Sequence, residues 1–197
     1  MDRVMVKIRA FIAIPLPGNI LTEVRRVQES LKRVPHKFRW VRPENIHLTL
    51  KFLGDIDATA TAVIFEAMRE TAREFMPLSL SVRGLGVFPG VRRPRVLWAG
   101  LAGQTGRLIE LQHTLETYLE DKGYDRDRKK SFKGHLTIAR VKGRVDSAKF
   151  VETLETVGRF ETDPFTADRF ILYQSDLKPS GAVYTALKTA RLESPPS

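Results

Sequence analysis

The 197-residue sequence predicts an α+β fold made of two similar lobes, and three observations support this. Strand-like stretches, rich in β-branched and aromatic residues, alternate with stretches whose apolar residues recur every three to four positions, as in helices. The order of these stretches in the first half of the chain returns in the second half. The composition, with 42% hydrophobic and 28% charged residues, is that of a globular domain and excludes disorder, collagen and coiled coil.

The first half is expected to contain four strands and two helices. Apolar stretches between turn residues predict the strands, at residues 9–15, 45–53, 78–82 and 96–101. Apolar residues follow the helical period from Ile20 to Val34, behind Asn19, which is a favourable N-cap residue. A second helix is expected from Asp57 to about Phe75, because Pro77 would end it.

The second half is expected to repeat this order. The predicted elements are a helix at 105–122, a strand at 132–141, a helix at 146–157 and strands at 165–173 and 182–187. The spacing repeats as well, since 28 residues separate Asn19 from His47 and 30 separate Thr105 from His135. We therefore expect one bilobal domain over residues 1–197, an internal repeat whose halves are related by an approximate two-fold axis and meet near the Gly-rich segment 100–106.

The charge of the chain indicates a polyanionic partner. There are 33 Lys and Arg residues against 23 Asp and Glu, which gives a net charge of +10 and a pI near 10.1. RNA, DNA or nucleotides are the natural partners of such a protein. The alternative is a basic surface that only keeps the protein in solution.

Several classes of site are excluded by what the chain lacks. It contains no cysteine, so disulfides, thiolate nucleophiles and cysteine-ligated metals are ruled out. No apolar run approaches the roughly 18 residues of a membrane span, and the apolar stretch near the start has no small-residue cleavage site. A cytoplasmic protein that does not act at a membrane is expected.

Two of the four histidines occur in nearly identical tetrapeptides, His47-Leu-Thr-Leu and His135-Leu-Thr-Ile. Side chains two apart on a strand share a face, so His47 lies beside Thr49, and His135 beside Thr137, while the aliphatic residues face the core. One such motif alone is typical of a half-buried histidine held by a neighbour. Two copies instead predict a site, in which the two-fold axis brings two imidazoles and two hydroxyls together across a cleft.

These four side chains are suited to phosphoryl transfer without a metal. An in-line displacement at phosphorus needs a base on the attacking oxygen and an acid on the leaving oxygen. Histidine can fill either role at neutral pH because its ordinary pKa is near 6.5. Threonine hydroxyls can donate hydrogen bonds to the non-bridging oxygens, where the negative charge is concentrated.

The duplicated His-x-Thr-hydrophobic motif resembles the signature of the 2H phosphoesterases. Within that superfamily the sequence is most similar to the RNA 2′,3′-cyclic phosphodiesterases, also called 2′-5′ RNA ligases. The similarity extends over about residues 9 to 190 and is carried by segments 9–14, 39–47, 50–54, 84–89, 135–140 and 172–184. One departure is Gly134, which precedes the second histidine where many relatives have proline.

The resemblance implies a fold and an activity. The fold would have two antiparallel β-sheets facing a central cleft, with helices packed on the outside. The activity would be hydrolysis of RNA 2′,3′-cyclic phosphate ends, with tRNA halves as one such RNA, to 2′-phosphates. No metal, cofactor or obligate protein partner is implied. The reverse reaction, 2′-5′ ligation, is open to the same site because the 5′-hydroxyl of a second RNA can replace water.

The resemblance also assigns roles to individual residues. His47 would be the general acid that protonates the departing 3′ oxygen, and His135 the general base that activates water. Thr49 and Thr137 would hold the phosphate.

Two further positions match nucleotide-binding residues of the family. Phe11 matches the aromatic residue that stacks on the terminal base, although its place in an apolar stretch also fits the core. Arg140 matches the arginine that packs on or near that base, although a charge at the end of a strand is often only solvated.

Other interpretations remain open at this point. The same fold could act on a small cyclic phosphate such as ADP-ribose 1″,2″-cyclic phosphate, or could be a non-catalytic RNA-binding module. The basic segment with Arg92, Arg93 and Arg95 could contact RNA phosphates or could simply be exposed.

Overall fold

The structure is a computed structural model that describes residues 6–33, 37–126, 131–143, 147–179 and 181–193. Its helices are α1 (Gly18–Lys32), α2 (Thr61–Arg73), α3 (Thr105–Asp121) and α4 (Ser147–Val157). Its strands are β1 (Lys7–Pro15), β2 (Phe38–Trp40), β3 (His47–Asp57), β4 (Leu78–Phe88), β5 (Val96–Gly103), β6 (Leu136–Val141), β7 (Phe165–Ala167), β8 (Arg169–Lys178) and β9 (Gly181–Arg191). Within the described residues, no helix is both long and apolar enough to cross a membrane.

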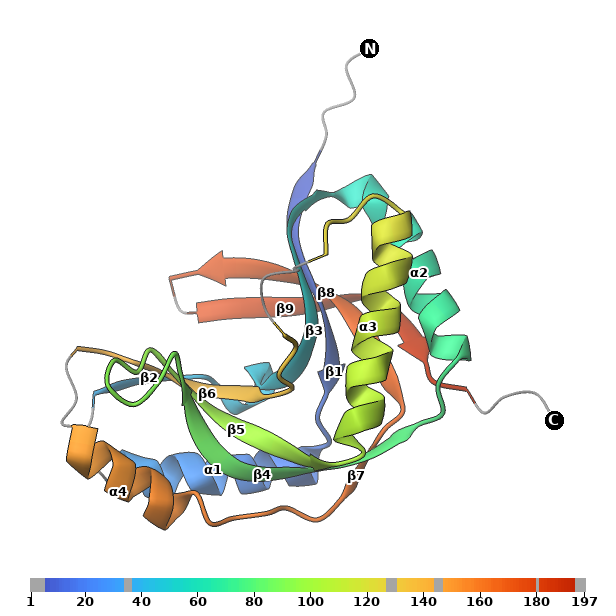
Figure 1. Ribbon diagram of the computed structural model, residues 1–197. Coiled ribbons are helices and arrows are strands. Elements are labelled where there is room, and N and C mark those ends of the chain that lie inside the picture. The colour runs from blue at the N-terminus through green and yellow to red at the C-terminus, as the bar shows by residue number, and fades with distance from the viewer. Residues whose placement is uncertain (1–5, 34–36, 127–130, 144–146, 180, 194–197) are drawn as a thin grey trace.

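The strands form a curled antiparallel sheet that is shared by two lobes (Figure 1). The order along the sheet is β7-β4-β5-β6-β3-β1-β8-β9, and β2 pairs with β6. In the first lobe α2 and α3 cover β1, β3, β8 and β9, and in the second lobe α1 and α4 cover the other strands. Among the described strands the two lobes are joined by one pair of residues, Leu48 and Leu136. The predicted α+β class with antiparallel strands and outer helices is confirmed.

The lobes do not coincide with the two halves of the sequence. The β4–β5 hairpin comes from the first half but pairs with β6 of the second half, while β8 and β9 of the second half extend the sheet from β1. The Gly-rich segment 100–106 is therefore not a free connection between lobes. It completes β5, where Gly103 pairs with Leu80, and it contains the first two residues of α3.

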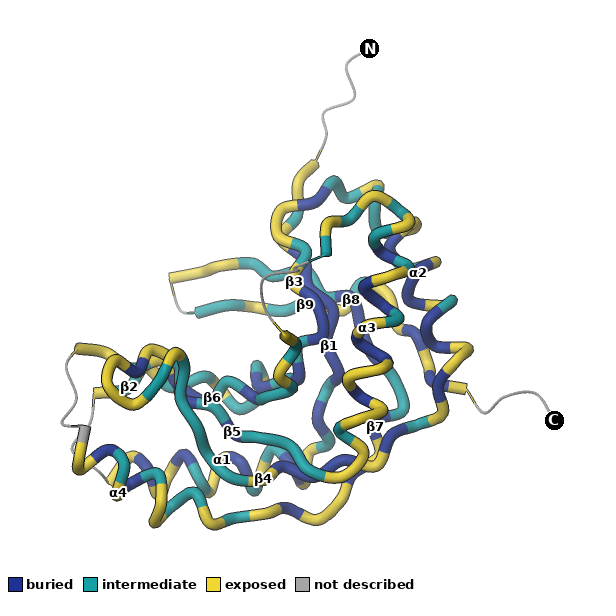
Figure 2. The backbone as a smooth tube through the Cα atoms, viewed as in Figure 1, coloured by how far each residue is buried: buried dark blue, intermediate teal, exposed yellow. Residues whose placement is uncertain are grey.

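Apolar side chains of the helices and sheet pack into a core that explains where the helices lie. On α1 the buried positions Ile20, Val24 and Leu31 lie on the predicted apolar face, and Gln28, which was not predicted, is buried with them. In Figure 2, buried positions concentrate on β1 and on the inner faces of the helices, whereas the ends of both lobes are exposed.

The helix starts differ in detail from those predicted. Asn19 is not an N-cap, because α1 already begins at Gly18 after Pro17. The expected cap Asp57 does accept a 2.8 Å hydrogen bond from the backbone N–H of Thr59, in the 3₁₀ turn Ala58–Ala60 that leads into α2. The expected helix residues Val34 and Asp146 lie outside the described residues.

Three strand predictions need correction. The three residues of β2 were not predicted, because so short a segment shows no periodicity. The single strand expected at 165–173 is two strands: β7 pairs with β4, and β8, which begins after Asp168, pairs with β1. The strand expected from Phe132 begins only at Leu136, the residue that meets β3.

An ion pair inside the first lobe holds three segments together. Lys51 of β3 and Glu116 of α3 are 8% and 5% exposed, and their Nζ and Oε2 atoms are 2.7 Å apart. Lys51 Nζ also donates a 2.6 Å hydrogen bond to the carbonyl of Asp125, beyond the end of α3. Moving the two charges from water into the protein interior costs free energy, and their mutual attraction offsets this cost only while both partners are present.

Replacing Lys51 by methionine is expected to lower the free energy of unfolding by about 3–5 kcal/mol, because Glu116 is left as an unpaired buried charge. Urea denaturation measures this loss. The double variant Lys51→Met/Glu116→Leu should recover most of it, since no charge remains to be desolvated. The matched control is Lys32→Met, which removes a cation from an exposed pair with Glu29 and should cost about 0–1 kcal/mol. Equal losses for Lys51→Met and Lys32→Met would contradict the prediction.

Candidate active site

The two histidine motifs meet at the junction of the lobes. Leu48 and Leu136 are fully buried and lie opposite each other in antiparallel strands. One residue to either side of this pair, the register places His47 across from Thr137, and Thr49 across from His135. These four side chains share the face opposite the leucines, and the two histidines lie diagonally across it.

A β-bulge follows the threonine in each motif. In β3 the register with β1 skips Leu50, and in β6 the register with β5 skips Ile138. A bulge reverses the alternation of faces, so the fifth residue after each histidine returns to the face of the site. These residues are Phe52, which is 70% exposed, and Arg140, which is exposed.

The backbone carbonyl of each bulged residue is satisfied by a buried glutamine. Gln112 of α3 donates a 3.3 Å hydrogen bond to the carbonyl of Leu50, and Gln28 of α1 donates a 2.9 Å bond to the carbonyl of Ile138. Both glutamines are less than 10% exposed. The Ile138 carbonyl also accepts a 3.0 Å hydrogen bond from the Val41 N–H. Because a buried carbonyl that lacks hydrogen bonds costs free energy, the glutamine amides stabilise the two bulges.

Each histidine is oriented by a backbone carbonyl two residues before it. Nδ1 of His47 lies 2.8 Å from the carbonyl oxygen of Asn45, and Nδ1 of His135 lies 2.6 Å from that of Lys133. Because a carbonyl only accepts, each Nδ1 carries the hydrogen, and Nε2 is the nitrogen left for proton transfer.

Aromatic rings surround His47. Its ring stacks on Phe11 with centroids 4.7 Å apart and meets the edge of Tyr184 at 5.4 Å. The desolvation that follows lowers the pKa of His47 below its ordinary value, and the hydrogen bond to the Asn45 carbonyl opposes the shift. The imidazole is therefore favoured in its neutral form when no anion is bound.

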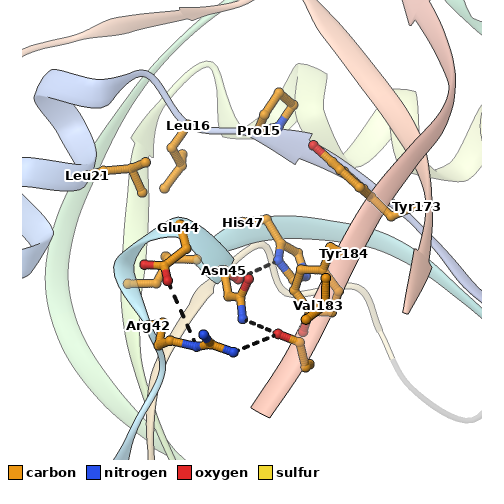
Figure 3. Close-up of a pocket in the computed structure, with 12 residues that line it drawn as sticks. Pro15, Leu16, Leu21, Arg42, Glu44, Asn45, His47, Tyr173, Val183 and Tyr184 are labelled. Atoms are coloured by element: carbon orange, nitrogen blue, oxygen red, sulfur yellow. Dashed lines mark hydrogen bonds and ion pairs between the residues drawn. The ribbon is translucent and has the colours of Figure 1, made fainter. Parts of the chain in front are cut away.

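Beside His47 lies a pocket of about 340 Å³, which we call the His47 pocket (Figure 3). It is lined by Pro15, Leu16, Leu21, Arg42, Glu44, Asn45, Ile46, His47, Tyr173, Ala182, Val183 and Tyr184. The tip of the β8–β9 hairpin closes one side, because Arg42 and Asn45 both donate hydrogen bonds to the Ala182 carbonyl. The pocket thus combines aromatic and aliphatic walls with polar groups at one end.

His135 has its own aromatic surroundings, which come from the β4–β5 hairpin. Its ring meets Phe88 at 5.0 Å and Trp98 at 6.1 Å, both edge to face. Trp98 lies across from Gly86, where a Cβ atom would come within 2.2 Å of the indole. Glycine at this position therefore leaves room for the indole to lie over the strand beside the second motif.

Comparison with known proteins identifies the family of the chain. The model of the family described as LigT like Phosphoesterase matches residues 14–98 and 101–184, so that each matched stretch contains one histidine motif. The chain belongs to the LigT-like phosphoesterase family. It is 34% identical to the RNA 2′,3′-cyclic phosphodiesterases of Methanothermobacter thermautotrophicus and Thermotoga maritima, over 94% of this chain and 100% and 96% of theirs.

Solved structures show the same fold. The crystal structure of TT0787 of Thermus thermophilus superposes with a TM-score of 0.77 at 27% identity, covering 93% of this chain and 97% of that one. E. coli LigT complexed with 3′-AMP superposes with a TM-score of 0.71 at 24% identity, covering 96% of this chain and 100% of that one, a likeness of fold alone.

The structure of this LigT-like phosphoesterase brings together His47, His135, Thr49 and Thr137, as the sequence predicts. In the described part of the chain neither threonine hydroxyl has a hydrogen-bond partner, so both can donate to a ligand. Metal-binding groups of three or more His, Asp or Glu side chains are not found among the described residues.

Burial bears on one of the two base-binding expectations, and the other stays a prediction. Phe11 is only 3% exposed, because Tyr173 stacks on it at 5.3 Å and His47 covers it as well. A ring so covered does not fit the expectation that it stacks on a base, and it instead supports His47 from below. Arg140 is exposed on the face of the site, and its charge acts to lower the pKa of Tyr184, while its contact with a base stays a prediction.

Sequence reasoning missed Tyr173, Tyr184 and the two glutamines. The tyrosines stand in a segment that was recognised only as similar to the family, 125 or more residues from His47. The contact of Tyr173 with Phe11 and that of Tyr184 with His47 depend on the pairing of β8 with β1 and with β9. For the glutamines the sequence did contain a signal. Each stands on the apolar face of its helix, which is an unusual place for a polar residue.

Replacing Tyr184 by alanine should raise the pKa of His47 toward its ordinary value, because burial is the main cause of its depression. NMR titration of the imidazole in the free protein measures the change. Tyr118→Ala, on α3 away from the site, serves as the control and should leave the His47 titration as it is. An unaltered His47 pKa in the Tyr184 variant would show that another group controls its protonation.

Proposed function

We propose that the protein hydrolyses the 2′,3′-cyclic phosphate at the end of an RNA chain to a 2′-phosphate. The observation that carries the proposal is the register of β3 and β6, which sets two imidazoles diagonally across one face with Nδ1 of each tied to the backbone. Relatives that are 34% identical over nearly their whole length are named RNA 2′,3′-cyclic phosphodiesterases, which supports this substrate.

In the proposed reaction the phosphate lies between the two histidines. His135 Nε2 takes a proton from a water molecule as the water oxygen attacks phosphorus. The bond from phosphorus to the 3′ oxygen breaks, and that oxygen receives the proton carried by His47 Nε2. The products are a 2′-phosphate and a 3′-hydroxyl, and proton exchange with solvent restores both imidazoles.

The surroundings of His47 fit an acid that is charged only with substrate. Burial lowers its pKa in the free protein, whereas the negative phosphate favours the imidazolium. The hydrogen bond to the Asn45 carbonyl also favours the charged ring. Substrate binding and protonation of His47 are therefore coupled, with each promoting the other.

The remaining groups hold the substrate. Thr49 and Thr137 lie on the same face as the histidines and donate hydrogen bonds to the non-bridging oxygens, where charge builds up during the reaction. The His47 pocket, with Tyr173 and Tyr184 in its wall, receives the terminal nucleoside. Burial raises the pKa of Tyr184, although Arg140 and Arg9 oppose the shift, so its hydroxyl stays a donor.

Reversal of the same steps gives 2′-5′ ligation, with the 5′-hydroxyl of a second RNA in place of water. tRNA halves are one class of RNA with suitable ends. We propose this RNA chemistry in the cytoplasm, and the basic charge of +10 supports an RNA partner.

The variants His47→Ala and His135→Ala should each lose about 10²–10⁴-fold in kcat/KM on a 2′,3′-cyclic substrate, as is typical for loss of a general acid or base. The double variant should be little worse than either single variant, because the two groups act as a unit. His113→Ala, on the exposed side of α3, is the matched control and should retain full activity. Turnover that survives the loss of both histidines would overturn the proposal.

The same variants separate the acid from the base. A substrate analogue with a leaving group of low pKa hardly needs protonation, so it should restore activity to His47→Ala far more than to His135→Ala. Preferential rescue of His135→Ala would reverse the two roles while leaving the two-histidine mechanism in place.

Hydrolysis is expected to continue at full rate in EDTA, because imidazoles fill both proton-transfer roles and hydroxyls fill the charge-stabilising role. Initial rates before and after chelation measure this, with a zinc-dependent hydrolase as a positive control for chelation. A rate that collapses in EDTA and returns with zinc or manganese would refute this part of the mechanism.

A further inference from the structure

Seven exposed cations gather at the end of the second lobe, and we call them the lobe-end patch. They are Lys37, Arg39, Arg92, Arg93, Arg95, Arg140 and Lys142. The three segments that carry them, 37–41, 89–96 and 139–143, contain no Asp or Glu. Strand β2, the end of β6 and the turn between β4 and β5 lie side by side here (Figure 1).

Four of these cations form two like-charged rows across a pair of strands. Arg39 lies opposite Arg140, and the 2.8 Å hydrogen bond from the Lys142 N–H to the Lys37 carbonyl continues the register, so these lysines are also opposite. Like charges directly opposite each other are destabilising, unless an anion lies between them.

The rows face the same way as the active site. Between them Phe38 packs toward Phe150 of α4, with ring centroids 6.1 Å apart, so the cations on either side of it point away from the helices. Arg140 is the member nearest the site, since its charge acts on Tyr184 in the wall of the His47 pocket. The lobe-end patch is thus continuous with the place proposed for the terminal nucleoside.

The seven cations lack acidic partners among the described residues, whereas elsewhere Lys32, Lys51, Arg69, Arg107 and Lys122 each lie within 4.0 Å of a glutamate. Two rows of side chains that are two residues apart along a β-strand are separated by roughly 6.4–6.8 Å. This is about the distance between successive phosphates of an extended single-stranded RNA. The patch therefore matches both the charge and the phosphate spacing of such an RNA.

We propose that the lobe-end patch binds the phosphates of the RNA chain upstream of the reacting end. This inference rests on the proposed function and extends it: the protein binds an oligonucleotide substrate more tightly than a free cyclic nucleotide, through phosphates outside the reacting end. Binding would release counterions from several phosphates, which makes it strongly dependent on salt.

The test compares two double variants that lose the same charge. Lys37→Ser/Lys142→Ser removes one row of the patch, and Arg26→Ser/Arg73→Ser removes exposed arginines from α1 and α2, which cover the opposite face. Kinetics are measured on an RNA of about 12 nucleotides with a 2′,3′-cyclic end, a length within the range of single-strand sites. The second substrate is a 2′,3′-cyclic mononucleotide.

The patch variant should raise KM for the RNA about fivefold per cation removed at 0.1 M salt, since each phosphate contact contributes about 0.7 to the log-log salt slope. The slope itself should fall by about 1.4. Both variants should turn over the mononucleotide like the unaltered protein, and the control should also handle the RNA normally.

An unchanged KM for RNA in the patch variant would overturn the inference, and so would an equal loss on both substrates, which would assign the lysines to the site itself. If the patch variant lost binding to phosphatidylserine vesicles while its RNA kinetics stayed intact, the lobe-end patch would instead be a membrane-binding surface. If the unaltered protein turned over neither substrate, the proposed function would fail. Fluorescence anisotropy with a 2′-phosphate RNA would then still decide whether the patch binds RNA.

Discussion

The pairing of Leu48 with Leu136 is the contact on which the site depends. It joins the lobes, and it is short: one pair of residues, after which β3 and β6 separate into their own parts of the sheet. Because the pair is antiparallel, a histidine and a threonine from each motif fall on one face in a crossed arrangement. A slip of either strand by one residue would turn the histidine and threonine of that strand into the core. The burial of its leucine opposes such a slip, since the slip would expose that leucine.

The bulges at Leu50 and Ile138 explain why the fourth position of each motif is aliphatic. Each bulged residue places its side chain in the core. Its carbonyl accepts a hydrogen bond from a buried helix glutamine in each lobe, and the Ile138 carbonyl accepts a second one from the Val41 N–H. The consequence reaches the surface, because the reversed alternation returns Phe52 and Arg140 to the face of the site. Helix position, strand irregularity and side-chain direction are therefore linked by two hydrogen bonds.

Electrostatics differ between the centre of the site and its rim. At the centre, Phe11 and Tyr184 desolvate His47 and favour the neutral imidazole. At the rim, arginines without acidic partners among the described residues favour an anion. A phosphate that enters the site brings the negative charge that an imidazolium needs. In the proposed reaction the aromatic cluster thus delays the charging of His47 until the substrate is present, and the proposed role of the cations is to increase the local concentration of that substrate.

The sequence by itself determined the α+β class, most of the helices and strands, and the pairing of His47 with Thr49 and of His135 with Thr137, because local periodicity and alternation carry this information. Only the tertiary structure decided that the halves exchange hairpins, that Phe11 is covered by Tyr173 and His47, and that Lys51 meets Glu116 across 65 residues of sequence. These outcomes depend on which strand edges pair and on where a bulge reverses the faces. Such choices are made by hydrogen bonds and packing between distant segments, and no local pattern of side chains records them.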